Sequence, residues 1–151
     1  MKKILIIFIG LFTAWPCLAQ QPVEWSFYSR KLADNSYEIH LQATIDKGWY
    51  IYSQSSSKKG APTEIKILPD NNLKLKGGIK EEGSLIKKKE LGESANVHLF
   101  ENQVDFVQQV TTGNGQPKLI KVTISYTPSN GMERLPVQTV SFSIILNQDT
   151  E

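Results

Sequence analysis

Few side chains in this chain could carry out covalent or metal chemistry. The sequence has one cysteine, Cys17, and two histidines, His40 and His98, which both lie in strand-like segments far along the chain from Ser129. A nucleophilic serine requires a neighbouring base and an oxyanion hole, and no Gly-x-Ser-x-Gly motif occurs. A zinc site requires three or four closely spaced ligands. We therefore expect no catalytic residue, no metal and no cofactor.

Ser129 lies in the segment on which the interpretation depends, residues 124–137 (ISYTPSNGMERLPV). Apolar residues alternate with polar ones up to Tyr126, which predicts a β-strand. Asn130 and Gly131 are turn-forming residues, and a second alternating run follows. Because loops held by a rigid sheet commonly carry binding groups, we predict a site at this loop.

The spacing within this loop resembles the active-site loop of the N-terminal periplasmic domain of the thiol:disulfide interchange protein DsbD. The family pattern is Tyr-x-x-Cys-x-x-x-x-Cys, followed by an apolar or aromatic residue and proline. Tyr126 stands at the tyrosine position, and Leu135-Pro136 stands at the apolar-proline position. Ser129 and Arg134 occupy the two cysteine positions.

A second segment supports the resemblance, which extends over roughly residues 25–146. Residues 45–52 (IDKGWYIY) look like the family's turn and aromatic strand, whose tyrosines lie near the cysteine pair. Alternation places Tyr50 and Tyr52 on one face and Trp49 on the other. Aromatic strand residues usually pack in cores, whereas exposed ones at concave sites bind partners.

Thiol–disulfide exchange requires sulfur, because it proceeds through a thiolate and a mixed disulfide. Ser129 offers an alcohol and Arg134 a permanent cation, so the chain is expected not to be an enzyme. The family also caps its cysteines with an aromatic side chain, and residues 84–99 contain none. The resemblance implies a retained binding surface, formed by Tyr126, Ser129, Asn130, Arg134, Pro136, Trp49, Tyr50 and Tyr52.

Residues 1–19 are predicted to be a signal peptide. Lys2-Lys3 precedes a short apolar run, and small residues precede a cleavage site after Ala19. Trp15-Pro16 is unfavourable for lipidation of Cys17, so we expect no membrane anchor. The chain is then periplasmic or secreted.

Cleavage would leave residues 20–151 as a single domain without cysteine. Removal of Lys2 and Lys3 would leave 15 of the 17 basic side chains and all 15 acidic ones, which gives a formal net charge of zero. A neutral domain has no global field that attracts nucleic acid or anionic lipid. Its stability must come from its core, since no disulfide can form within it.

Turn residues recur at strand spacing and no helical periodicity is visible. The pattern predicts an all-β, immunoglobulin-like β-sandwich of about nine short strands. The clearest strand is Tyr37–Ile45, with His40 facing solvent. Residues 73–86 are expected to form one or two short strands, and Val97–Phe100 a hairpin with Val104–Val110. Ser53–Pro62 is expected to be a mobile loop and Lys87–Lys89 a solvated hairpin tip.

The sequence thus favours an exported, non-catalytic binding or scaffold module that resembles the DsbD N-terminal domain. One alternative is an accessory protein of a periplasmic thiol-reducing or cytochrome c maturation pathway, whose partner supplies both cysteines. Another is a generic exported β-sandwich with an adhesive or ligand-binding role. The implied partner is a thioredoxin-like or envelope protein.

Overall fold

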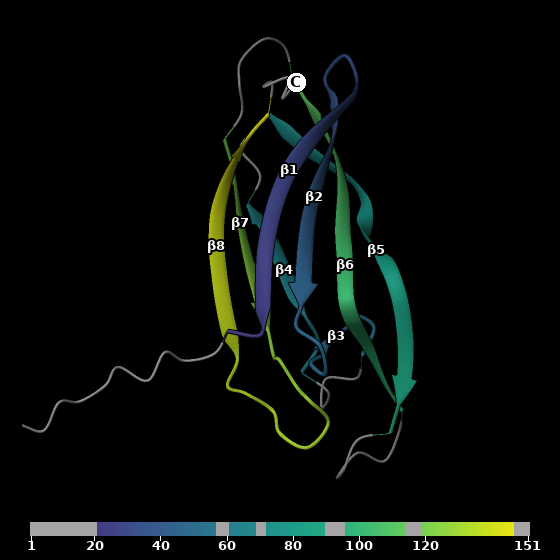
Figure 1. Cartoon of the computed structure of the whole chain (residues 1–151). Coiled ribbons are helices and arrows are strands. Elements are labelled where there is room, and N and C mark those ends of the chain that lie inside the picture. Colours follow the sequence, from purple (N-terminus) through teal and green to yellow (C-terminus); the bar gives the residue numbers. More distant parts are fainter. Residues whose placement is uncertain (1–20, 57–60, 69–71, 90–95, 114–118, 147–151) are drawn as a thin grey trace, which may run out of the picture.

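The chain folds into two antiparallel β-sheets that face one another (Figure 1). This computed structural model describes residues 21–56, 61–68, 72–89, 96–113 and 119–146, and the predicted signal peptide lies outside them. The described part contains no helix, and therefore none that could cross a membrane. The strands are β1 (Val23–Ala33), β2 (Ser36–Ile45), β3 (Ile51–Tyr52), β4 (Glu64–Leu68), β5 (Leu73–Lys88), β6 (Val97–Thr112), β7 (Leu119–Tyr126) and β8 (Gln138–Ile145).

The five-stranded sheet has the order β1-β2-β6-β3, with β5 also paired to β6, and the three-stranded sheet has the order β4-β7-β8. This arrangement confirms the predicted all-β, immunoglobulin-like sandwich. Eight strands are described rather than about nine, because two of them are longer than the sequence pattern suggested.

Strand β2 forms where the sequence predicts it, since its apolar residues alternate with polar ones without interruption. Ile39, Leu41 and Ala43 are fully buried on its inner face. β2 pairs with β1 on one side and with β6 on the other, so it is a central strand. The apolar residues of the alternating pattern are therefore the ones that are buried between the sheets.

The predicted hairpin between residues 97 and 110 is wrong, because β6 runs through it as one strand of 16 residues. Asn102, which suggests a turn in the sequence, has a φ of 61° within the continuous strand. β5 is also continuous over 16 residues, and its pairing with β6 shifts register near Gly77 and at Gly83. These residues accommodate irregularities in long strands rather than ending short ones.

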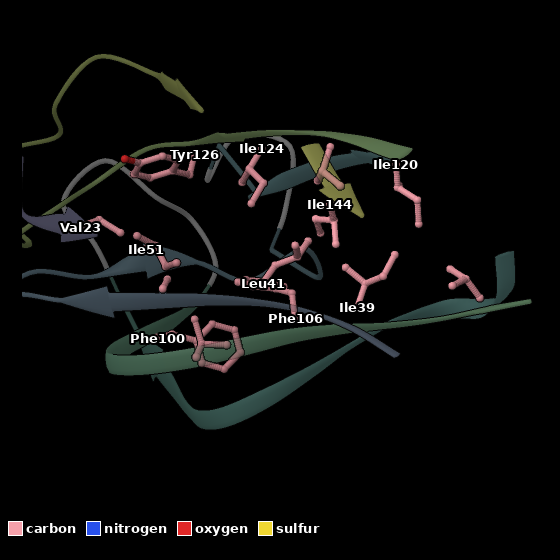
Figure 2. Close-up of a cluster of buried hydrophobic side chains, with 14 of the residues drawn as sticks. Val23, Ile39, Leu41, Ile51, Phe100, Phe106, Ile120, Ile124, Tyr126 and Ile144 are labelled. Carbon is pink, nitrogen blue, oxygen red and sulfur yellow. The ribbon is translucent and has the colours of Figure 1, made fainter. Parts of the chain in front are cut away.

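The main hydrophobic core lies between the two sheets (Figure 2). Leu41 and Phe106 contribute from the five-stranded sheet, and Ile124 and Ile144 from the three-stranded sheet. Burial of such side chains contributes about 1.5–3 kcal/mol each, so this cluster is the principal source of stability.

His40 is not solvent-facing as predicted, since only 6% of it is exposed. The Tyr28 ring stacks on its imidazole at 4.4 Å between centroids, and its Nδ1 lies 2.7 Å from an oxygen of Asp105. Tyr28 is the register partner of His40 on β1. The outer face of a central strand is thus covered by long side chains of its neighbours, which alternation alone does not reveal.

Candidate functional site

The candidate site lies at the end of the sandwich where the loop between β7 and β8 meets the start of β3. Ser129 forms isolated antiparallel bridges with both Tyr50 and Arg134. The Tyr50 N–H donates to the Ser129 carbonyl at 2.7 Å, and the Ser129 N–H donates to the Tyr50 carbonyl at 3.0 Å. These bridges join the loop to the aromatic segment, as the resemblance implies.

The tip of the loop is held by its own polar groups. The Asn130 side-chain oxygen accepts hydrogen bonds from the N–H groups of Met132 (3.0 Å) and Glu133 (2.8 Å). Ser129 Oγ accepts one from Gly131, whose φ of 87° favours glycine. The turn residues therefore fix a conformation that leaves Met132 94% exposed.

Tyr50 and Tyr52 belong to a second, smaller hydrophobic cluster with Val97 and Leu99. Trp49 packs instead against the main core, which confirms that alternation separates it from the two tyrosines. Tyr52 is fully buried, whereas Tyr50 is partly exposed. Of the two tyrosines in this cluster, only Tyr50 therefore contributes to its surface.

Two cations cover these tyrosines. Lys88 Nζ lies 4.3 Å from the centroid of the Tyr50 ring and donates a 3.0 Å hydrogen bond to its hydroxyl. The guanidinium carbon of Arg134 lies 5.2 Å from the centroid of the Tyr52 ring. Cations over aromatic faces are attracted by the ring quadrupole, so the surface of the cluster is both aromatic and positive.

Lys88 is therefore a site residue that the sequence interpretation missed. Its segment was predicted to be a solvated tip, and the charge run gave no sign of a contact with Tyr50. The contact arises because β5 and β3 both pair with β6, which brings Lys88 beside a residue 38 positions earlier. Only the strand order could have indicated it.

The segment after β3 is anchored, contrary to the predicted mobile loop, although residues 57–60 lie outside the described part. Ser53 is fully buried, and its hydroxyl donates to Glu81 at 2.6 Å. Ser55 Oγ lies 2.8 Å from Ser53 Oγ and 3.1 Å from His98 Nδ1. Because Ser53 gives its proton to Glu81, Ser55 must donate to Ser53, and His98 must donate to Ser55.

This chain of hydrogen bonds places His98 in its own polar cluster. His40 bonds to Asp105 on the outer face of the five-stranded sheet, as described above. Each imidazole thus has a partner other than Ser129 within the described residues. No group of three or more histidine, cysteine or acidic side chains in the described part is arranged to hold a metal ion.

Tyr126 lies in the core rather than on the surface. Its ring packs edge-on against Trp25 at 5.3 Å, and its hydroxyl donates to the Gln138 side chain at 2.9 Å. Burial raises the pKa of the Tyr126 hydroxyl above its ordinary value of 10.0. This tyrosine therefore anchors the end of β7 from which the loop departs.

The remaining candidates differ in exposure. Ser129 is only 1% exposed, Asn130 is partly exposed, and Arg134 and Pro136 are exposed. A partner that approaches this end would meet Arg134, Pro136 and Met132 before it met Ser129. Ser129 positions the loop through its backbone and hydroxyl.

Comparison with known proteins supports the fold. The structure is similar to the N-terminal periplasmic domain of ScsB from Proteus mirabilis, with a TM-score of 0.60 and 12% identity. The match covers 85% of this chain but 47% of that one, so the chain spans about half of the ScsB structure. The Neisseria meningitidis DsbD N-terminal domain in its reduced form matches with a TM-score of 0.53 and 17% identity, over 81% of this chain and 86% of that one.

No family model matches the chain, and no curated protein matches its sequence. The two structural matches show that the chain has a DsbD N-terminal-domain-like fold, as the loop pattern predicted. At these identities the likeness concerns the fold alone.

Proposed function

We propose that this protein is an exported, non-catalytic module that binds a protein partner through the loop end of its sandwich. The observation that carries the proposal is the antiparallel bridge between Ser129 and Arg134. By the loop resemblance these residues stand at the family's cysteine positions, and in this proposal the loop keeps the frame of a thiol-exchange loop without its sulfur atoms.

The substituting side chains account for the absence of exchange chemistry in this proposal. Ser129 is buried and accepts a hydrogen bond from Gly131, while Arg134 approaches the Tyr52 ring. Neither group forms a thiolate or a disulfide. Both hold the loop and its surroundings in a defined arrangement.

The surface of this end suits recognition. Met132 is an adaptable apolar side chain that is almost fully exposed on a hydrogen-bonded loop. Tyr50, Lys88 and Arg134 lie close to its base and add aromatic and cationic character. A preorganised loop loses little conformational freedom on binding, which favours affinity.

The fold likeness to two periplasmic domains supports a place in a thiol pathway in the periplasm. In this proposal the partner is a thioredoxin-like protein that brings its own cysteines. The present chain then docks or orients that protein and exchanges no electrons with it.

Site-specific photo-crosslinking in the exporting cell tests the proposal. A photoreactive residue at position 132 should crosslink to a thioredoxin-like protein. The matched control is Leu68, which is 60% exposed and lies at the opposite end of β4 from the loop, since Glu64 pairs with Ser125 and Leu68 with Lys121. Position 68 should give no such product.

A second variant connects the crosslink to the site. Lys88→Ala should reduce the yield at position 132, because the cation over Tyr50 is lost. Equal products at positions 132 and 68 would contradict a dedicated binding end. A glycan or an envelope structural protein at position 132 would replace the thiol-pathway assignment with an adhesive one.

A further inference from the structure

Strand β8 has an edge with which no other described strand pairs, although β1 lies close to it and the Phe27 ring of β1 stacks on Phe142 at 4.3 Å between centroids. It pairs with β7 along residues 138–145, and it ends the order β4-β7-β8. An uncovered edge presents unpaired N–H and C=O groups, which form a template for another strand. Folded proteins usually block such edges with charged residues, proline or bulges.

The edge strands β1, β4 and β5 of the described part are protected in this way. β1 carries Arg30 and Lys31 and shifts register after Lys31. β4 carries Glu64 and Lys66, and β5 carries several lysines and two register shifts. β8 has no charged residue, no proline and no register shift. Its edge is thus left open for pairing.

The outward side of β8, together with Val137 immediately before the strand, has a symmetric pattern. Alternate residues from position 137 to 145 face away from the core, and they are centred on Ser141. Val137 and Ile145, at the two ends, are 65% and 48% exposed. The residues between them, Thr139, Ser141 and Ser143, all carry hydroxyls. An antiparallel copy of the same strand would therefore meet its own pattern in reverse.

We propose that two copies of this chain associate through β8, antiparallel and about a two-fold axis that passes beside Ser141. In this register Ser141 faces Ser141 of the second copy, Thr139 faces Ser143, and Val137 faces Ile145. Hydroxyl pairs and apolar pairs opposite one another both stabilise antiparallel strands. The two three-stranded sheets then join into one continuous sheet with a closed, isologous interface.

The pattern also selects this register over its neighbours. Centring the pair on Val140 or Phe142 would place apolar ends opposite hydroxyls, such as Ile145 opposite Thr139. A pairing offset by one residue would set inward residues opposite outward ones. A second copy is favoured over an unrelated strand because the uncharged edge matches itself without repulsion between like charges.

Cysteine scanning tests the register directly. In a Cys17→Ser background, Ser141→Cys should give a covalent dimer under mild oxidation, because opposed antiparallel residues have Cα atoms about 4.5–5.5 Å apart. Thr139→Cys and Ser143→Cys should not crosslink alone but should crosslink when the two variants are mixed. Efficient crosslinking of position 139 or 143 alone, or none at 141, would overturn the proposal.

Analytical ultracentrifugation of the unmodified chain and of two lysine variants tests the interface. Thr123 and Ser141 are register partners on the same face, with side-chain oxygens 3.1 Å apart, but only Ser141 lies on the edge strand. Ser141→Lys should weaken dimerisation on the order of tenfold, because it opposes like charges across the axis. Thr123→Lys should leave the dimer intact. A wild-type chain that stays monomeric at all concentrations would refute the proposal, as would equal weakening by both variants.

Discussion

The two hydrophobic clusters of this molecule differ in composition and in what lies above them. The main core between the sheets is formed chiefly by aliphatic and phenylalanine side chains contributed by both sheets. The second cluster lies beneath the loop end and consists of Tyr52, Val97 and Leu99 with Tyr50 beside them. Lys88 and Arg134 approach the faces of its two tyrosines.

The main core therefore chiefly stabilises the fold, whereas the second cluster lies under the surface that a partner would contact. The main core depends on the close packing of apolar side chains, which tolerates few changes of volume. The loop end is held by backbone bridges that join Ser129 to Tyr50 and Arg134, and by turn hydrogen bonds to the side-chain oxygens of Ser129 and Asn130. The backbone bridges at positions 129 and 134 do not require particular side chains, so this part of the loop frame is compatible with residues other than cysteine.

Truncation in the main core should have the largest effect on stability. Leu41→Ala and Ile124→Ala each remove a fully buried side chain, one from each sheet, and should lower the free energy of unfolding by about 2–5 kcal/mol. Thr44→Ala, on the exposed side of β2, should change it by less than about 0.5 kcal/mol. Denaturant titration measures all three, and equal costs would show that the assignment of faces is wrong.

Gly83→Ala should have the next largest effect, because β5 approaches β6 closely there. A Cβ at this position would lie 3.1 Å from the Gln103 carbonyl oxygen and 3.2 Å from atoms of Phe100 and Val104. We expect a loss of about 1–3 kcal/mol in thermal or chemical unfolding. Gly78→Ala is the matched control, since a Cβ there meets no atom within 4 Å. A neutral Gly83→Ala would mean that the strands separate at little cost.

Replacing Lys88 should affect the stability of the domain only slightly. The lysine covers Tyr50 at an exposed position, where a cation–π contact contributes about 0.5–1 kcal/mol. Lys88→Ala should therefore shift the unfolding midpoint much less than Leu41→Ala does. A loss comparable to a core truncation would show that the second cluster is as important for stability as the first.

The smallest expected effect is on how the stability of the fold depends on pH. The hydrogen bond from Arg30 is the main cause that lowers the pKa of Glu38 below its ordinary value of 4.5. Because the folded-state pKa is depressed, the stabilisation is present above about pH 4.5 and is lost as the pH falls through the folded-state value. Arg30→Ala should weaken this dependence of the unfolding free energy on pH, measured between about pH 6 and about pH 3. An unchanged profile would show that Glu38 does not contribute.

Alternation predicted the strands in which it is uninterrupted, namely β2, β7 and β8. It failed in β5 and β6 because Gly77, Gly83 and Asn102 look like turn residues in a sequence. In the structure they lie in irregular but continuous strands. The energy of a long paired strand outweighs a local preference for a turn, and only the presence of a partner strand reveals that.

The candidate site was predicted in part by the spacing of the loop. Ser129, Arg134 and Tyr50 are brought together, as the family pattern implied. The burial of Ser129 and the position of Lys88 were not evident, because each depends on contacts between segments far apart in sequence. The hydrogen-bonded cluster of Ser53, Glu81 and His98 was missed for the same reason.

Our proposal implies that the loop keeps the geometry of a disulfide site while it lacks the sulfur atoms. It is tested most directly by Ser129→Cys combined with Arg134→Cys in a Cys17→Ser background, followed by thiol counting and mass measurement after exposure to air. The bridge between the two positions brings their Cα atoms within the range that a disulfide requires, about 4.4–6.8 Å. We expect an intramolecular disulfide in the variant and no reduction of a thioredoxin-like partner by the unmodified chain. Cysteines that stay reduced or link two molecules, or exchange activity in the unmodified chain, would contradict the account.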